Sequence, residues 1–166
     1  MALTKQGLAS AIKEKTSNIA DPQQAINALW SAICDYFESN AEVSYSWSAV
    51  NPSGTPDPEV MWIGNIKTSG SLTLTNAATP EQALSLLTSM LNTQIATWVV
   101  EPPAGYSLTP MLIEPMINLG VSKADTRDSA LEAFAGYIIE GVVKATSSTS
   151  GTHGAYSGTG TFTNIA

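Results

Sequence analysis

The sequence is poor in charged residues, and above all in basic ones. Only 13% of its 166 residues are Asp, Glu, Lys or Arg, whereas about 25% is usual in globular proteins. Its 14 acidic residues outnumber the 7 basic ones, and Arg127 is the single arginine. Nucleic-acid binding needs clustered Lys and Arg, and Lys5, Lys13 and Lys15 form the one local basic group. We therefore expect no direct binding to nucleic acid.

The chain also has only one cysteine and one histidine, Cys34 and His153. A single cysteine excludes a disulfide within the chain. His153 lies in a Gly-rich segment without Cys, Asp or Glu at ligand spacing, so we interpret it as a surface residue. We expect neither a histidine-based metal site nor a Ser-His-Asp triad. Glycine motifs for binding phosphates or dinucleotides are missing as well.

Two pairs of acidic residues are the remaining candidates for catalysis. Asp57 and Glu59 lie among prolines in a predicted loop, and Asp125 and Asp128 lie where a helix is expected to begin. Negative charge is favourable at a helix start, so both pairs have an explanation without acid–base chemistry. The sequence therefore predicts a protein that is not an enzyme and has no metal or cofactor.

Long apolar runs are also lacking. No stretch approaches the roughly 18 apolar residues of a membrane span. The start of the chain has neither the basic residues nor the apolar run of a signal peptide. We expect a protein without a membrane anchor that is made in a cytosol.

What the sequence does contain is four segments with helical periodicity, at residues 3–16, 22–39, 80–99 and 126–145. The start signals are strongest at Asp21-Pro22 and Thr79-Pro80, where a capping side chain precedes a proline at the first helical position. The predicted helices 22–39 and 126–145 carry similar apolar stripes. This similarity leaves open either an internal duplication or shared capping chemistry alone.

Alternation with a period of two predicts strands after residue 40. Residues 43–48 alternate apolar side chains with serines, which indicates a half-buried strand. Residues 51–59, with three prolines and a glycine, are expected to form a loop. Residues 60–67 and 71–75 then predict a hairpin whose second arm is a polar edge.

Together these segments predict an α+β fold of about four helices packed on a small, mostly antiparallel sheet. Residues 1–145 form a single domain in this interpretation. An extended segment at 146–166 follows it and is ordered by strand pairing or by a partner. The expected core joins apolar residues of three helices: Leu29, Ile33, Leu87, Leu91, Ile95, Phe134 and Ile138.

The segment 146–166 is rich in Ser, Thr and Gly and has too few apolar residues to fold alone. Its alternation suits a strand added to an exposed sheet edge, either the arm 71–75 or a sheet in a neighbouring subunit. We favour the neighbour, because an uncovered Thr-rich edge invites uncontrolled pairing. Trp30 lies off the apolar stripe of its helix and is a candidate interface anchor. The candidate interface residues are Trp30, Ser71, Thr73, Thr75, Tyr156, Thr159, Thr161, Phe162 and Thr163.

The order of these elements resembles small virion structural proteins of tailed bacteriophages. The resemblance rests on a short amphipathic first helix, an apolar helix leading into a Ser/Thr-rich strand, Trp98 followed by Pro102-Pro103, a last helix and a Gly/Thr-rich end. It implies a structural subunit of the neck, tail or baseplate, or a protein that decorates the capsid. It transfers no catalytic residue to this chain.

We therefore expect a non-catalytic virion subunit, made in the host bacterial cytoplasm. It would assemble with itself and with other virion structural proteins through helix packing and strand addition. A weakly charged, hydroxyl-rich composition suits such contacts, because Ser and Thr cost less to desolvate than Lys or Glu. The alternative is a small-molecule or peptide-binding module with a pocket between helix 80–99 and the sheet.

Overall fold

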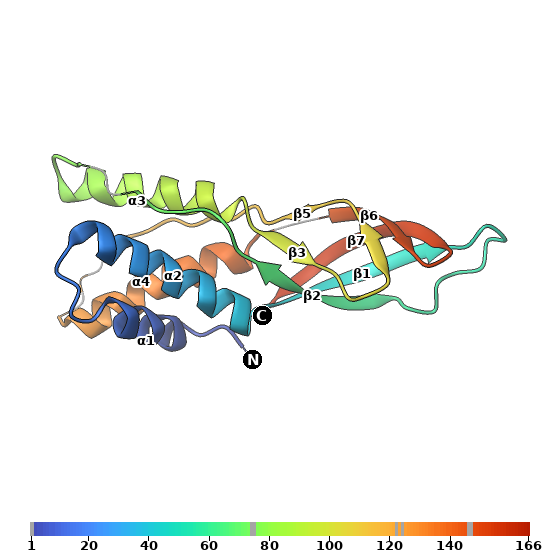
Figure 1. Cartoon of the computed structure of the whole chain (residues 1–166), viewed down its shortest axis with the longest axis horizontal. Helices are drawn as coiled ribbons and strands as arrows, with labels where there is room; N and C mark the ends of the chain where they lie inside the picture. The colour runs from blue at the N-terminus through green and yellow to red at the C-terminus, as the bar shows by residue number, and fades with distance from the viewer. Residues whose placement is uncertain (1, 74–75, 122, 124, 146–147) are drawn as a thin grey trace.

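The computed structural model describes residues 2–73, 76–121, 123, 125–145 and 148–166. Within these ranges the chain forms an elongated molecule, with four helices gathered at one end and a seven-stranded antiparallel sheet at the other (Figure 1). The predicted α+β fold class is therefore confirmed. Both chain termini lie near the junction of the two ends.

Each helix begins after a side chain that caps its free backbone N–H groups. Thr4, Asp21, Thr79 and Thr126 each accept a hydrogen bond from the backbone N–H three residues further on. The helices are α1 (Lys5–Thr16), α2 (Pro22–Asn40), α3 (Pro80–Ile95) and α4 (Arg127–Val143). All four occur where the sequence predicts them, but α3 ends before residue 99 because Val99–Glu101 is extended and joins the sheet. Among the described residues, no helix is both long and apolar enough to cross a membrane.

The strands follow the order β4-β6-β7-β1-β2-β3-β5. Their bounds are β1 (Glu42–Val50), β2 (Met61–Lys67), β3 (Val99–Glu101), β4 (Tyr106–Leu108), β5 (Met111–Leu112), β6 (Ser148–His153) and β7 (Tyr156–Ile165). The two outermost strands, β4 and β5, are consecutive in the chain, with only Thr109 and Pro110 between them. This short connection brings the margins of the sheet together, so that the sheet is nearly closed into a barrel.

The predicted hairpin of residues 60–67 with 71–75 is wrong. β2 pairs with β1 and β3, residues 71–73 belong to no strand, and residues 74 and 75 lie outside the described residues. The segment packs on the helices instead: Leu72 is buried, and the Ser71 backbone N–H donates to Gln94 Oε1 of α3 at 2.9 Å. A side chain of α3 thus accepts the hydrogen bond that a strand partner was expected to accept.

Residues 148–166 form strands β6 and β7 of the chain's own sheet. β7 lies between β6 and β1 and pairs with β1 along most of its length. The expectation that this segment pairs with the arm 71–75 or with a neighbouring subunit is therefore wrong. Glycine makes the close pairing possible, since a Cβ atom at Gly158 would lie 1.9 Å from the carbonyl oxygen of Ser48.

A continuous core runs from the helices into the sheet. At the junction, the Trp98 ring lies 5.4 Å from Phe37 and 5.8 Å from Trp30, measured between centroids. The seven predicted core residues divide into fully buried ones, Ile33, Leu91, Ile95 and Ile138, and half-buried ones packed against the core, Leu29, Leu87 and Phe134. The predicted helix faces therefore do point to the core.

Candidate functional site

The outer surface of the sheet is lined by hydroxyl groups. Along β1, Tyr45 and Trp47 point to the interior and are buried, which leaves Ser46 and Ser48 exposed on the outside. The same alternation continues on the two strands beside it. The hydroxyl residues on the outside are Ser44, Ser46 and Ser48 of β1, Ser157, Thr159, Thr161 and Thr163 of β7, and Ser148, Ser150 and Thr152 of β6.

Strand register places these hydroxyl groups in rows across the sheet. Thr161 of β7 lies between Ser46 of β1 and Ser148 of β6, and the next row, through Thr159, is also made of hydroxyl residues. Most of these hydroxyl groups form no hydrogen bond within the described ranges. The exceptions are Ser46, whose Oγ contacts Thr161 O at 3.4 Å, and Thr163, whose Oγ1 donates to a backbone carbonyl at 2.9 Å. The others are free to bond to water or to a partner.

An apolar strip borders the hydroxyl rows. Met61 and Ile63 of β2 are 63% and 52% exposed, and they lie opposite Ser46 and Ser44 of β1. Apolar side chains beside uncharged polar ones are typical of the surfaces that proteins bury against each other. We call the outward hydroxyl residues of β1, β6 and β7, together with Met61 and Ile63, the sheet face.

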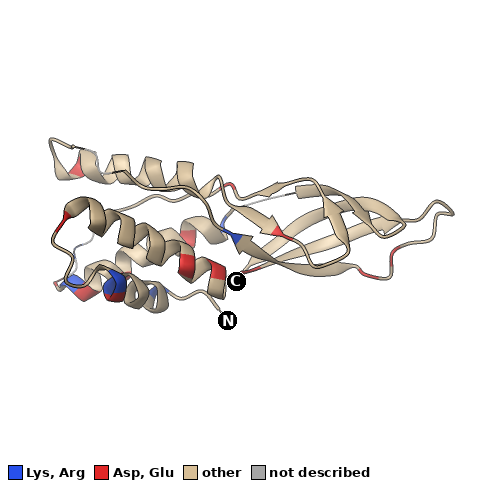
Figure 2. Cartoon of the chain, in the orientation of Figure 1, with Lys and Arg blue, Asp and Glu red and all other residues tan. Residues whose placement is uncertain are grey.

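Charge is almost absent from the strands that form the sheet face. In β1, β2, β6 and β7, the only residues with a formal charge are Glu42 and Lys67. Both lie at the ends of strands next to the helices. Figure 2 shows that Lys, Arg, Asp and Glu gather instead on the helical end. The sheet face can therefore be buried without desolvating a charged side chain.

The structure divides the predicted interface residues. Thr159, Thr161 and Thr163 are exposed on the sheet face, whereas Tyr156 and Phe162 of the same strand are half-buried. Ser71 and Thr73 are exposed outside the sheet, and Thr75 lies outside the described residues.

Trp30 belongs to the core instead of the surface. It is 7% exposed, and its Nε1–H donates to Gly70 O at 2.8 Å. The helical period places it off the main stripe, but the segment after β2 runs back along α2 (Figure 1), and its Gly70 carbonyl accepts the hydrogen bond from the indole. The prediction that Trp30 is an interface anchor was therefore wrong, because sequence periodicity does not reveal that a loop covers the helix.

A polar cluster at the far end of the barrel joins residues that the sequence analysis kept apart. His153 Nδ1 lies 2.7 Å from Asp57 Oδ2, which also accepts a hydrogen bond from Trp47 Nε1 at 2.9 Å. The Tyr106 hydroxyl donates to Glu59, and the Tyr106 ring stacks on His153 with centroids 4.2 Å apart. We call Asp57, Glu59, Tyr106 and His153 the tip clasp.

The tip clasp stabilises an ionised Asp57. Its side chain is 1% exposed, and burial alone would raise its pKa, but its hydrogen-bond donors, His153 first among them, hold the pKa below its ordinary value. The pKa of Tyr106 is raised by burial and by its hydrogen bond to the Glu59 carboxylate. The Asp57 carboxylate is therefore held ionised although it is buried beneath the rings of Trp47 and His153.

The contacts of the tip clasp are those of a structural lock. It fastens the loop between β1 and β2 to β4 and β6. Within the described ranges, no hydroxyl or thiol group bonds to His153 Nε2, whose charged neighbour is Glu59 Oε2 at 3.9 Å. The side chain of His153 is 24% exposed, so the interpretation of a free surface histidine was wrong. Asp57 and His153 are 96 positions apart, and no local pattern links them.

Metal binding and known relatives give no further guide to the site. Among the described residues, no group of three or more His, Cys, Asp or Glu side chains is placed to hold a metal ion. No known protein family, curated protein or solved structure matches this chain. The sheet face, the tip clasp and the cavities are therefore interpreted from their geometry.

Proposed function

We propose that this chain is a non-catalytic structural subunit of a tailed-phage virion, and that it assembles with copies of itself through the sheet face. The observation that carries the proposal is the sheet face. Its rows of hydroxyl groups, most of which have no hydrogen bond within the described ranges, lie beside exposed Met61 and Ile63 and carry no formal charge. The virion setting rests on the resemblance of the element order to phage structural proteins.

The chemistry of the sheet face favours contact with protein. Burying apolar surface stabilises an interface by about 25 cal/mol per Å², which Met61 and Ile63 would contribute. Ser and Thr hydroxyl groups can exchange bonds with water for bonds across an interface at little net cost. Two copies of this face carry no like charges that would repel each other.

The charge on the rest of the molecule supports the same contact. All basic residues except Lys67 and most acidic residues belong to the helices and their connections. With a net charge of −7, two copies repel each other where charges are exposed and approach most easily where they are absent. The sheet face is therefore the favoured contact between copies.

Helix α3 is the second surface that suits assembly. Only Leu91 and Ile95 of this helix are buried, while Leu84, Leu87 and Met90 remain partly exposed. α3 lies along one side of the helical end (Figure 1). We assign to it the helix packing with other virion proteins. Strand addition by residues 148–166 is not part of this proposal, because β7 already pairs on both sides within its own sheet.

A charge placed in the sheet face tests the proposal. Thr161→Lys puts a cation in the middle of the face, and Ser39→Lys puts the same cation on an exposed position of α2 as the control. Sedimentation velocity over a range of concentrations should show self-association of the unaltered chain and of Ser39→Lys. Thr161→Lys should weaken it at least tenfold, because a lysine would have to be desolvated without a partner.

Two results would contradict the assembly proposal. One is a chain that stays monomeric at every concentration, and the other is a Thr161→Lys variant that associates like the unaltered chain. Circular dichroism must first show that both variants are folded. Mass spectrometry of purified phage particles tests the virion assignment separately, and failure to find the chain there would remove it.

The alternative function is a binding module with a pocket between residues 80–99 and the sheet. It would need a cavity at that place and would not depend on the sheet face. A cavity of about 560 Å³ lies between α1 and α4.

A further inference from the structure

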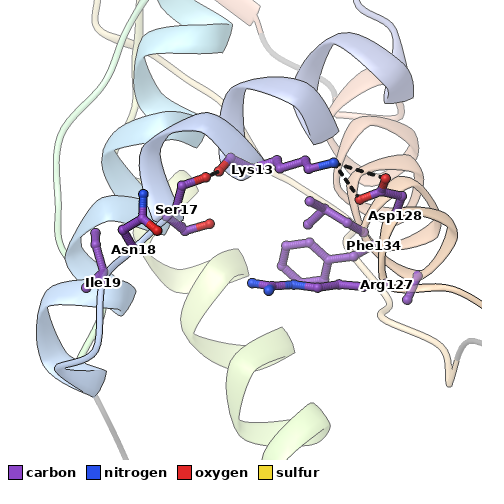
Figure 3. Close-up of a pocket in the computed structure, with 10 residues that line it drawn as sticks. Lys13, Ser17, Asn18, Ile19, Arg127, Asp128 and Phe134 are labelled. Atoms are coloured by element: carbon purple, nitrogen blue, oxygen red, sulfur yellow. Dashed lines mark hydrogen bonds and ion pairs between the residues drawn. The ribbon is translucent and has the colours of Figure 1, made fainter.

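A cavity of about 560 Å³ lies at the helical end of the molecule. Residues 13–19, at the end of α1 and in the turn after it, form one wall, and residues 127–134 of α4 form the other (Figure 3). Its volume falls within the roughly 300–1,000 Å³ usual for small-molecule sites. The cavity is far from the sheet face, at the opposite end of the elongated molecule.

One positive charge in this cavity has no ion-pair partner among the described residues. Arg127, the first residue of α4, extends into the space before Ser17 and Asn18 (Figure 3). Within the described ranges it forms no ion pair or hydrogen bond. Lys13, by contrast, is 2.9 and 3.0 Å from the two carboxylate oxygens of Asp128. The Arg127 guanidinium is therefore the cation that the cavity offers to a ligand.

The other polar groups of the cavity differ in what they can still donate. The hydroxyl groups of Thr16 and Ser17 donate to the backbone carbonyls of Ile12 and Lys13, at 2.7 and 2.6 Å, so they can only accept further bonds. Asn18 has a φ of 60°, and its side-chain amide forms no hydrogen bond within the described ranges. Asn18 and Arg127 are thus the free donors.

The remaining wall of the cavity is apolar. Leu131 and Phe134 of α4 and Ile19 of the turn line it, and all three are only half-buried. Phe134 packs against the core, as predicted, and it also lines the cavity. Uncovered apolar surface next to a free guanidinium is the combination that binds a ligand with an apolar body and one anionic group.

We propose that this cavity binds a small organic anion that joins one carboxylate to a compact apolar or aromatic body. Arg127 binds the carboxylate with two parallel N–H···O bonds, and Asn18 adds a donor. Leu131 and Phe134 pack against the body of the ligand. A phosphate fits less well, because one free cation faces it and the apolar wall stays unused. This proposal does not depend on assembly through the sheet face.

Titration of the full-length chain with 2-naphthoate, followed by amide chemical shifts, tests the site. We expect saturable shifts at residues 16–19 and 127–134. The neutral analogue 2-naphthalenemethanol should bind at least tenfold more weakly. Arg127→Gln should lose about tenfold in affinity for 2-naphthoate but not for the alcohol. Lys144→Gln, which removes a lysine paired with Glu140 outside the cavity, should bind like the unaltered chain.

A second variant keeps the test independent of Arg127 itself. Ser17→Glu places a negative charge at an exposed position of the cavity wall and should abolish binding of 2-naphthoate. Equal affinity of the Arg127→Gln and unaltered chains would overturn the proposal. So would shifts that do not saturate, or shifts that map to the sheet. Loss of self-association by Thr161→Lys has no bearing on these results, so the two proposals fail separately.

Discussion

The helical end and the sheet end of this molecule are stabilised in different ways. The helical end carries most of the charged residues and has exposed ion pairs between its helices, among them Lys13 with Asp128 and Lys5 with Glu132. The sheet end has fewer charged residues, and stacked aromatic rings and the tip clasp stabilise it. Trp62 stacks on Tyr45 there with centroids 4.5 Å apart. Exposed ion pairs contribute little to stability, so charge at the helical end serves mainly to keep that end hydrated.

The contrast is consistent with a hydrated helical end and with the assembly that we propose for the sheet face. A net charge of −7 keeps copies apart wherever helices meet. The sheet face has no charges that would repel another copy. Its Ser and Thr hydroxyl groups cost less free energy to desolvate than charged side chains do. In the proposed assembly, the segregation of charge to the helical end directs contact to the sheet end.

Removal of the last strands should have the largest effect on this two-ended structure. A chain that ends at residue 147 lacks β6 and β7, which leaves β1 without one of its two neighbours and β4 without its pairing partner. We expect loss of the sheet and no cooperatively folded monomer, because the backbone hydrogen bonds and the inward side chains of β7 disappear together. Circular dichroism and amide chemical-shift dispersion measure this.

The full-length chain is the control for that truncation. The sequence interpretation makes the opposite prediction, since it treats residues 1–145 as a complete domain. A truncated chain that is folded and soluble would therefore support the sequence interpretation and contradict the register of β7 with β1.

The difference between the two predictions shows what the sequence could reveal. Helix starts are local: Asp21-Pro22 and Thr79-Pro80 carry their signals within a few residues, and the structure begins α2 and α3 there. The last helix was likewise predicted to begin at Asp125 or Thr126, and Thr126 caps it in the structure. Strands 43–48 and 60–67 were also recognised by alternation, and both exist in the sheet.

Pairing between distant strands could not be recognised in the same way. The partner of β7 is β1, more than 100 residues earlier in the chain, and alternation says only that a strand has two faces. The threonines at 159, 161 and 163 were selected as interface residues from a wrong pairing, yet they are exposed on the sheet face. The tip clasp was missed for the same reason, because the fold alone brings Asp57 to His153.

Matched truncations of core side chains test whether the two ends unfold as one unit. Ile33→Ala removes a fully buried residue of α2, and we expect it to lower the free energy of unfolding by about 2–5 kcal/mol. Trp62→Ala at the sheet end should lower it by about 3–5 kcal/mol, since Trp62 is buried between Tyr45 and Tyr106.

Urea denaturation should be followed by two signals for both variants. Far-ultraviolet circular dichroism reports mainly on helices, and tryptophan fluorescence reports on residues at both ends. Because the core runs through the junction at Trp98, the two signals should change at one midpoint in each variant. Separate midpoints would mean that the ends are independent domains, and unchanged midpoints would mean that the helix or strand faces are misplaced.

The tip clasp should make the smallest contribution, and its contribution should depend on pH. The pKa of Asp57 is lowered in the folded protein, so the unfolded chain takes up its proton first as the pH falls. The stabilisation is therefore complete well above the ordinary carboxyl pKa and is lost as the pH falls through that value towards the lowered one. Asp57→Asn should remove this pH dependence and lower the free energy of unfolding near neutral pH. The control Glu81→Gln on α3 should change neither the pH dependence nor the free energy of unfolding. Denaturation midpoints measured from pH 7 down to pH 3 decide the matter: parallel curves for Asp57→Asn and the unaltered chain would show that the carboxylate at the tip is not held in its ionised form.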